Sequence, residues 1–213
     1  MNTKPLRRNH QQAPEKIRTF IAIDLPEFMR TAIRTIQTDI RSSGFKARLT
    51  RPENVHLTLK FLGDVDTHRI AKINAAIKTS VKEIAPIHLG GRSLGVFPNS
   101  RRPRVLWMGL FGQIGALLRL QKKVDAQLAL LGFAREKRTF TGHLTIGRIK
   151  GKAPLRQVNR ILTQYETYVT EPFVVKEVIL FKSQLTPEGS IYTRLGSGHL
   201  KPLRNVSTAE SPC

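Results

Sequence analysis

One short pattern of polar and apolar residues occurs twice in this sequence, and its residue types could carry out proton transfer. His56-Leu57-Thr58-Leu59 recurs in the second half of the chain as His143-Leu144-Thr145-Ile146. Successive side chains of a β-strand point to opposite faces, so in each copy the imidazole and the hydroxyl share one face. The aliphatic side chains point to the other face, where a core could anchor them. We therefore expect two strands facing each other across a cleft, each offering one histidine and one threonine.

Two imidazoles and two hydroxyls suit in-line displacement at phosphorus. The unperturbed pKa of histidine, about 6.5, allows neutral and protonated forms to coexist near neutral pH. A neutral histidine can remove a proton from an attacking water, and a protonated one can donate to the departing oxygen. Thr58 and Thr145 can donate hydrogen bonds to phosphate oxygens on which charge builds up. We take His56 as the acid and His143 as the base, although the sequence does not decide between these roles.

The same residues also have structural interpretations. A lone histidine on a strand is more often a packing residue than a catalyst, and threonine is a good strand former. The repetition of one polar face in a strongly basic chain favours the catalytic interpretation. No carboxylate or third histidine lies at a metal-ligand spacing from either copy of the pattern, so we expect no metal site and no cofactor.

The charge balance points to an anionic partner. The chain has 36 Lys and Arg against 15 Asp and Glu, a net charge of +21 and a sequence pI of about 11.1. Such a field attracts polyanions, and we expect a nucleic acid or a phosphorylated ligand. No apolar run is long enough to cross a bilayer, and the one cysteine, Cys213, gives no evidence of an oxidising compartment. We expect a cytoplasmic monomer that does not bind membranes.

The elements that must position the repeated pattern alternate between strands and helices. Strands are predicted at 18–25, 55–63, 87–96, 105–110, 142–149, 172–185 and 190–195, and helices at 27–41, 67–84, 113–131 and 155–165. Strands interspersed with helices, ending in a hairpin, indicate an α+β fold with sheets covered on one side. We expect a single domain over residues 17–203, with a mobile basic tail at 1–16 and a mobile tail at 204–213.

Several segments, in the same order, resemble the 2H phosphoesterase superfamily and, within it, the RNA 2′,3′-cyclic phosphodiesterase family, also called the 2′-5′ RNA ligase family. The similar segments lie at 18–26, 51–65, 94–110, 143–150 and 183–192. The resemblance implies a bilobal fold of two antiparallel β-sheets with outer helices, related by pseudo-twofold symmetry, with the active cleft between the lobes. It also implies metal-independent hydrolysis of a terminal 2′,3′-cyclic phosphate to a 2′-phosphate. The implied substrates are RNA ends or cyclic nucleotides, and 2′-5′ ligation would be the reverse reaction.

The resemblance also implies residue roles. His56 and His143 become the catalytic acid–base pair, and Thr58 and Thr145 bind the phosphate. The arginine five residues after the second histidine, here Arg148, is implied to contact the phosphate as well. Strict alternation would place Arg148 on the face opposite to His143, and a kink at Gly147 could bring it back.

Phe20, in the first predicted strand, has two interpretations. It could line the cleft and stack on a nucleobase, since base–aromatic stacking does not depend on base sequence. Ordinary core packing explains an aromatic residue in a strand at least as well.

Two other functions remain open on the sequence. A non-catalytic protein of the same fold could hold RNA ends in a basic cleft, although such a protein would not need two proton-transfer groups. An enzyme acting on a small nucleotide cyclic phosphate would also fit the repeated pattern, and the high positive charge favours a polymer over this alternative.

Overall fold

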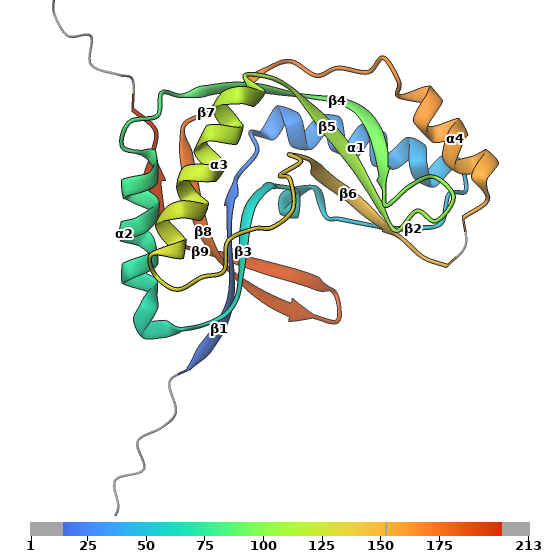
Figure 1. Ribbon diagram of the computed structural model, residues 1–213. Coiled ribbons are helices and arrows are strands. Elements are labelled where there is room, and N and C mark those ends of the chain that lie inside the picture. Colours follow the sequence, from blue (N-terminus) through green and yellow to red (C-terminus); the bar gives the residue numbers. More distant parts are fainter. Residues whose placement is uncertain (1–14, 152, 202–213) are drawn as a thin grey trace, which may run out of the picture.

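The computed structural model describes residues 15–151 and 153–201 (Figure 1). Residues 1–14 and 202–213 lie outside the described part, so the predicted tails are almost wholly untested. The strands are β1 (Lys16–Ile23), β2 (Ala47–Leu49), β3 (Leu57–Asp66), β4 (Ile87–Phe97), β5 (Val105–Gly112), β6 (Leu144–Ile149), β7 (Phe173–Val175), β8 (Glu177–Thr186) and β9 (Gly189–His199). The α-helices are α1 (Glu27–Ser42), α2 (Ile70–Val81), α3 (Ile114–Ala129) and α4 (Leu155–Gln164). The α+β fold class is confirmed.

The strands form one curled, antiparallel sheet with the order β7-β4-β5-β6-β3-β1-β8-β9, and β2 pairs with the outer part of β6. Its two halves, β3-β1-β8-β9 and β6-β5-β4-β7, meet where β3 pairs with β6 at Leu57 and Leu144. The two sheets expected from the sequence are therefore halves of one sheet. A twofold operation about this junction exchanges β3 with β6 and β1 with β5, which is the pseudo-symmetry that the repeated pattern indicates.

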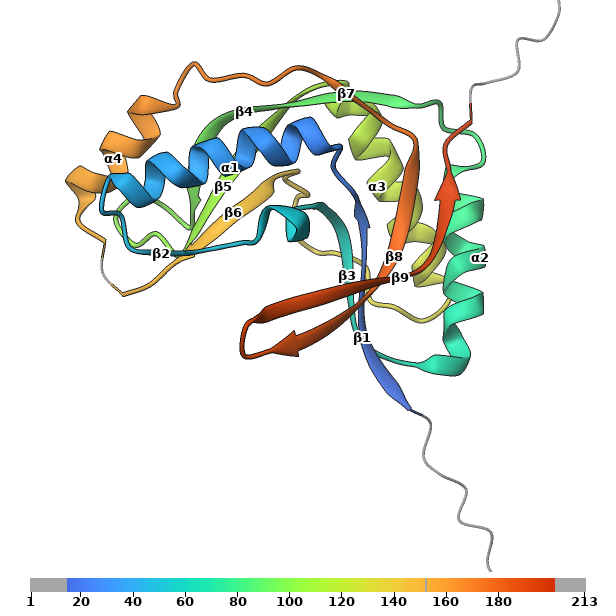
Figure 2. The ribbon, with the colours of Figure 1, turned by 180° about the vertical axis from the view of Figure 1, so that it is seen from behind.

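The helices cover the convex side of the sheet in two pairs (Figures 1 and 2). The helices α2 and α3 pack against each other beside β3, β8 and β9, whereas α1 and α4 lie over the half that contains β4 and β6. Each half of the sheet is thus covered by a helix that begins in the other half, α1 after β1 and α3 after β5. This exchange ties the halves into one apolar core, to which every α-helix contributes buried side chains.

One predicted strand, 172–185, is two strands in different halves of the sheet. β7 pairs with β4 at one edge, and β8 pairs with β1 near the other end. The chain passes from one half to the other at Lys176, which is exposed; Val175 before it is buried, and a run of buried residues begins at Val178 after it. Apolar residues on both sides of this point made the segment look continuous in the sequence, because a crossing between halves leaves no gap in the hydrophobic pattern.

No helix among the described residues is long and apolar enough to cross a membrane.

Candidate active site

The two copies of the repeated pattern lie side by side at the junction of the two halves of the sheet. Leu57 is paired with Leu144 in antiparallel orientation. Antiparallel pairing runs in opposite directions from this point, so His56 comes opposite Thr145, and Thr58 opposite His143. The expected pair of strands facing each other across a cleft is therefore a pair of neighbouring strands. All four polar side chains share the concave face of the sheet, and the two leucines are fully buried on the other face.

Each histidine is oriented by the same backbone contact. His56 Nδ1 is 2.8 Å from the carbonyl oxygen of Asn54, and His143 Nδ1 is 2.8 Å from the carbonyl oxygen of Thr141. A carbonyl oxygen can only accept a hydrogen bond, so Nδ1 must donate in both rings. The neutral form of each ring then has its lone pair on Nε2, and the protonated form has a proton there. Each Nε2 can thus act as a base or as an acid.

Aromatic rings pack against both imidazoles. The ring of Phe20 stacks on His56 with centroids 4.7 Å apart, and Tyr192 meets the same imidazole edge-on at 5.3 Å. On the other side, Phe97 meets His143 edge-on at 5.1 Å, and Trp107 lies 6.3 Å from it. These contacts restrict the rotation of both rings and leave the hydrogen-bonded orientation as the favoured one.

Burial affects the acid–base chemistry of His56. Loss of solvent lowers the pKa of its imidazole below the usual value, because the charged form loses hydration. The hydrogen bond to Asn54 and the negative charge of Asp24 oppose this effect, and the second imidazole, His143, adds to it. A lower pKa makes the protonated form of His56 scarcer near neutral pH but a stronger proton donor.

A β-bulge follows each threonine and changes the face on which the next residues lie. In β3 the partners of Thr58 and Lys60 are consecutive residues of β1, so Leu59 is the extra residue. In β6 the partners of Thr145 and Gly147 are consecutive residues of β5, which makes Ile146 the extra residue. An extra residue shifts the alternation of side chains by one position. The residue five positions after each histidine therefore returns to the concave face.

These two returning residues are Phe61 and Arg148, and both are exposed. The side chain of Phe61 is 70% exposed, which is unusual for a phenylalanine in the middle of a sheet. Arg148 lies on the same face as His143 and Thr145, as its predicted role requires. The structure thus places the cation of Arg148 and the exposed ring of Phe61 on the same surface as the two histidines and the two threonines.

Comparison with known proteins identifies the family. A family model described as LigT like Phosphoesterase matches residues 23–107 and 112–192. The chain belongs to the LigT-like phosphoesterase family. A relative from Methanothermobacter thermautotrophicus, named RNA 2′,3′-cyclic phosphodiesterase, is 34% identical over 84% of this chain and 96% of its own length. A relative of the same name from Archaeoglobus fulgidus is 37% identical over 84% of this chain and 98% of its own length.

Solved structures of similar proteins have the same fold. The crystal structure of TT0787 from Thermus thermophilus superimposes with a TM-score of 0.73 at 28% identity, covering 86% of this chain and 98% of that one. The crystal structure of LigT from E. coli in complex with NADP+ gives a TM-score of 0.68 at 24% identity, covering 88% of this chain and 99% of that one. The family predicted from the sequence segments is therefore confirmed.

One expectation about this LigT-like phosphoesterase, the kink at Gly147, differs from the structure. The kink expected at Gly147 is instead the bulge at Ile146, whose carbonyl accepts hydrogen bonds from the Thr50 backbone at 2.9 Å and from Gln37 Nε2 at 3.2 Å. Gly147 has a different use: a β-carbon there would lie 3.1 Å from the carbonyl oxygen of Arg48 in β2.

Phe20 lies in the site but has little accessible surface. Its side chain is 3% exposed and packs with Phe181 and Tyr192 in a small apolar cluster on the concave face. A ring this buried cannot offer a face to a nucleobase. Phe20 can therefore affect the site only through its stacking contact with His56. The accessible ring is that of its strand neighbour, Phe61, which pairs with it across β1 and β3.

Sequence reasoning missed Phe61, Phe97, Trp107 and Tyr192. Phe61 follows the first histidine at the spacing by which Arg148 follows the second, and this shared spacing could have pointed to it. The other three come from β4, β5 and β9, far from either pattern along the chain, and only strand pairing brings them to the histidines. Among the described residues of the LigT-like phosphoesterase, no group of three or more His, Cys, Asp or Glu side chains is placed to bind a metal ion.

Proposed function

We propose that this protein is a metal-independent RNA 2′,3′-cyclic 3′-phosphodiesterase, which hydrolyses a terminal 2′,3′-cyclic phosphate to a 2′-phosphate. The observation that carries the proposal is the pair of matched half-sites. Each has an imidazole whose Nδ1 donates to a backbone carbonyl, and each has a threonine two residues further on. Two such groups on one surface supply a base and an acid for a single displacement at phosphorus.

The side chains around the histidines provide binding and charge stabilisation. Thr58 and Thr145 lie opposite the partner histidine of the other strand, so both hydroxyls can donate to the same phosphate. The guanidinium of Arg148 can contact its non-bridging oxygens with a charge-assisted hydrogen bond. Such donors stabilise the transition state because negative charge increases on these oxygens during displacement.

The exposed ring of Phe61 suggests how the substrate is oriented. A nucleobase stacked on Phe61 places the terminal ribose on the His56 side of the phosphate. In-line attack requires the entering and departing oxygens on opposite sides of phosphorus. The departing O3′ is then next to His56, which donates the proton, and the attacking water is next to His143, which removes one. This orientation agrees with the roles taken from the sequence.

RNA ends are the proposed substrates, and cyclic nucleotides are smaller versions of the same chemistry. The names of the curated relatives and the net charge of +21 support a polymer with many phosphates. We propose a monomer that acts in the cytoplasm without a membrane partner. In 2′-5′ ligation a 5′-hydroxyl takes the place of water and O3′ departs, so the same groups transfer protons in the same directions. Its reverse is attack by the free 3′-hydroxyl on the 2′-5′ phosphodiester, with the proton transfers reversed.

The decisive experiment is an assay on an oligoribonucleotide that ends in a 2′,3′-cyclic phosphate, in the presence of a chelator, with the product identified by phosphorus NMR. The His56→Ala and His143→Ala proteins are compared with His88→Ala, which changes an exposed histidine outside the site. We expect a 2′-phosphate from the unchanged protein and from His88→Ala, with turnover lost in the two site variants. Tight, salt-sensitive RNA binding without any turnover would replace this proposal with a non-catalytic RNA-end-binding protein.

A further inference from the structure

Two cations lie directly opposite each other at the outer end of the catalytic surface. The short strand β2 runs beside the outer part of β6 (Figure 2), and in this register Arg48 comes opposite Arg148. Directly opposite residues of an antiparallel pair project to the same face, so both guanidinium groups lie on the concave face with the histidines. Like charges in this position destabilise a sheet. A contribution to the stability of the sheet therefore does not explain this pair.

The next pair of residues along the two strands is cationic as well. Lys150 donates its backbone N–H to the Lys46 carbonyl at 3.4 Å, which continues the pairing beyond the end of β2. Each lysine is two residues from the arginine of its own segment, so alternation places both ammonium groups on the concave face. Within residues 15–151 and 153–201, no carboxylate forms an ion pair with any of these four exposed cations. Their combined positive field attracts an anion to this end of the surface.

Buried contacts hold β2 in this register. The Thr50 amide donates to the Ile146 carbonyl at 2.9 Å, and Gln37 Nε2 donates to the Thr50 carbonyl at 2.7 Å. The side chain of Gln37 is 1% exposed. Leu49 packs against the core on the opposite face of the sheet. The backbone of Arg48 is therefore part of a strand with buried anchors, which is a rigid support for a binding residue.

The position of Arg48 relative to His56 indicates which anion it binds. β2 takes the place of β3 beside β6, so Arg48 and His56 follow one another along the same line of the sheet. His56 comes opposite Thr145, and two pairing positions separate Thr145 from Arg148. This spacing corresponds to about 7 Å along the strands. A group bound to Arg48 therefore lies next to a ribose held at His56.

Phe61 lies at the other end of the site. β3 and β6 run in opposite directions from their shared bridge, so Phe61 and Arg148 lie on opposite sides of the two His–Thr pairs. In a nucleoside, the base on C1′ and the 5′-carbon on C4′ leave the ribose in different directions. With its base on Phe61, a ribose at His56 directs its 5′-oxygen toward Arg48. In an RNA strand this oxygen carries the next phosphodiester.

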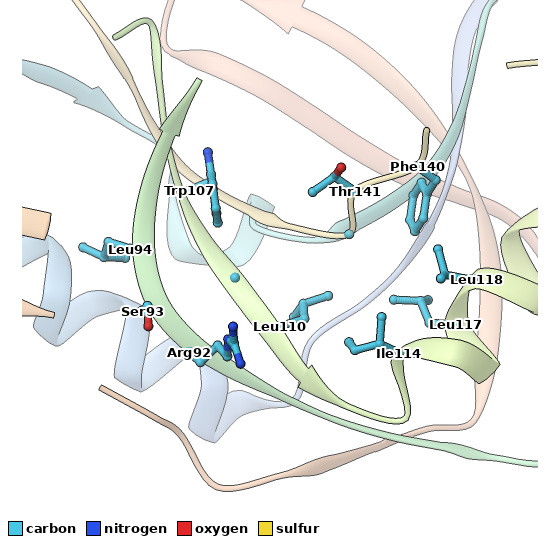
Figure 3. Close-up of a pocket in the computed structure, with 12 residues that line it drawn as sticks. Arg92, Ser93, Leu94, Trp107, Leu110, Ile114, Leu117, Leu118, Phe140 and Thr141 are labelled. Carbon is cyan, nitrogen blue, oxygen red and sulfur yellow. The ribbon is translucent and has the colours of Figure 1, made fainter. Parts of the chain in front are cut away.

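The pocket on the other side of His143 is poorly suited to a phosphate. This pocket has a volume of about 350 Å³ and lies beside the beginning of β6 (Figure 3). Its walls are mainly apolar and include Trp107, whose ring is 6.3 Å from the imidazole of His143. Arg92 is the cation among the lining residues. Apolar walls do not replace the hydration of a charged phosphate, so the cationic end of β6 is the better place for a second phosphate.

We propose that Arg48 binds the phosphodiester on the 5′ side of the terminal nucleoside, by which the protein distinguishes an RNA end from a cyclic mononucleotide. This inference rests on the proposed function. Arg148 contacts the reacting phosphate, and the guanidinium of Arg48 contacts the next one through charge-assisted hydrogen bonds. Lys46 and Lys150 extend the positive surface toward the following phosphates. An anion beside Arg48 offsets its repulsion with Arg148.

The test compares ligands that differ in the second phosphate, at one fixed ionic strength. The substrates are adenosine 2′,3′-cyclic phosphate, its 5′-phosphorylated form and a dinucleotide that ends in the same cyclic phosphate, and kcat/KM is measured for each. Calorimetric titration with adenosine 2′-phosphate and adenosine 2′,5′-bisphosphate gives a Kd for each without any turnover. Arg48→Gln is compared with Arg160→Gln, which removes an exposed arginine of α4 and changes the net charge equally.

We expect the unchanged protein and Arg160→Gln to favour each ligand that has the second phosphate by about 10-fold or more, the effect of one charge-assisted contact. In Arg48→Gln this ratio should fall to about 1, because the contact is lost. The inference is overturned if Arg48→Gln keeps the ratio of the unchanged protein, whether both ligands weaken equally or neither does. A preference for the 5′-phosphate that the dinucleotide lacks would also overturn it, because Arg48 would then bind a terminal phosphate and not an RNA strand.

Absence of hydrolysis by the unchanged protein would instead refute the proposed function. The ratio of the two Kd values would still decide whether Arg48 binds a second phosphate.

The thermal unfolding midpoint of the ligand-free protein gives an independent readout. At low salt, Arg48→Gln should unfold at a higher temperature than the unchanged protein, because the repulsion between the paired guanidinium groups is removed. Arg160→Gln should raise the midpoint less. A midpoint of Arg48→Gln below that of the unchanged protein would show that Arg48 stabilises the fold, and would overturn the interpretation of the pair as a binding site.

Discussion

His56 and His143 are oriented by the same backbone contact but have different surroundings. His56 packs against the buried ring of Phe20, and its loss of solvent lowers the pKa of its imidazole. His143 has edge contacts with Phe97 and Trp107 and lies beside an open pocket. Duplication of one strand pattern therefore provides two proton-transfer groups, and the side chains around them can give each a separate role.

The residue five positions after each histidine shows the same divergence. A bulge in each strand brings Phe61 and Arg148 to equivalent places on the concave face. One offers an aromatic ring and the other a cation. A symmetric backbone thus supports an asymmetric site, as a reaction with one entering and one departing oxygen requires.

The largest expected effect tests whether the two histidines act together. His56→Ala and His143→Ala should each lower kcat by about 10²- to 10⁴-fold, because each removes one proton transfer. The double variant should be little slower than either single variant, since groups that act in one step give non-additive losses. Single-turnover rates on the same cyclic-phosphate oligoribonucleotide measure all three. Losses that multiply in the double variant would show that the halves act independently.

The next effect distinguishes the two bulge-positioned residues. Phe61→Ala should raise KM by about 5- to 150-fold with little change in kcat, because a lost base stack weakens substrate and transition state alike. Arg148→Ala should mainly lower kcat, by about 10²- to 10³-fold, because its contact strengthens as charge develops on the phosphate. Arg156→Ala, an exposed cation on α4, is the control for net charge. If both site variants changed the same kinetic constant, the proposed division of roles would be wrong.

The smallest expected effect is a shift in the pH profile, and it distinguishes the acid from the base. The charge of Asp24 raises the pKa of His56, so Asp24→Asn should lower that pKa further. If His56 is the acid, its required protonated form is lost as pH rises through this pKa, and the alkaline limb of kcat/KM moves to lower pH. If His56 is the base, the acid limb moves instead and activity extends to lower pH. Asp64→Asn, an exposed carboxylate of β3, is the control. Two unmoved limbs would show that Asp24 does not act on His56.

Much of the fold could be predicted from the sequence, because the signals involved are local. The predicted helices and most strands agree with the structure to within a few residues, since each has its own apolar period and its own Gly, Pro or Ser boundary. The repeated pattern identified the His–Thr pairs through side-chain alternation, which depends only on a few consecutive residues. The positive charge and the family resemblance were also readable without any coordinates.

What the tertiary structure decided depends on pairing between distant strands. The adjacency of His56 and His143 follows from the single bridge between Leu57 and Leu144, and the strand break at Lys176 follows from the crossing between the two halves. Each bulge is defined by an extra residue relative to a partner strand, so alternation read from one strand alone placed Arg148 on the wrong face and overlooked Phe61. The sequence determined which groups are available for catalysis. Hydrogen bonding between strands determined which of them share a surface, because register is a property of two chain segments and not of one.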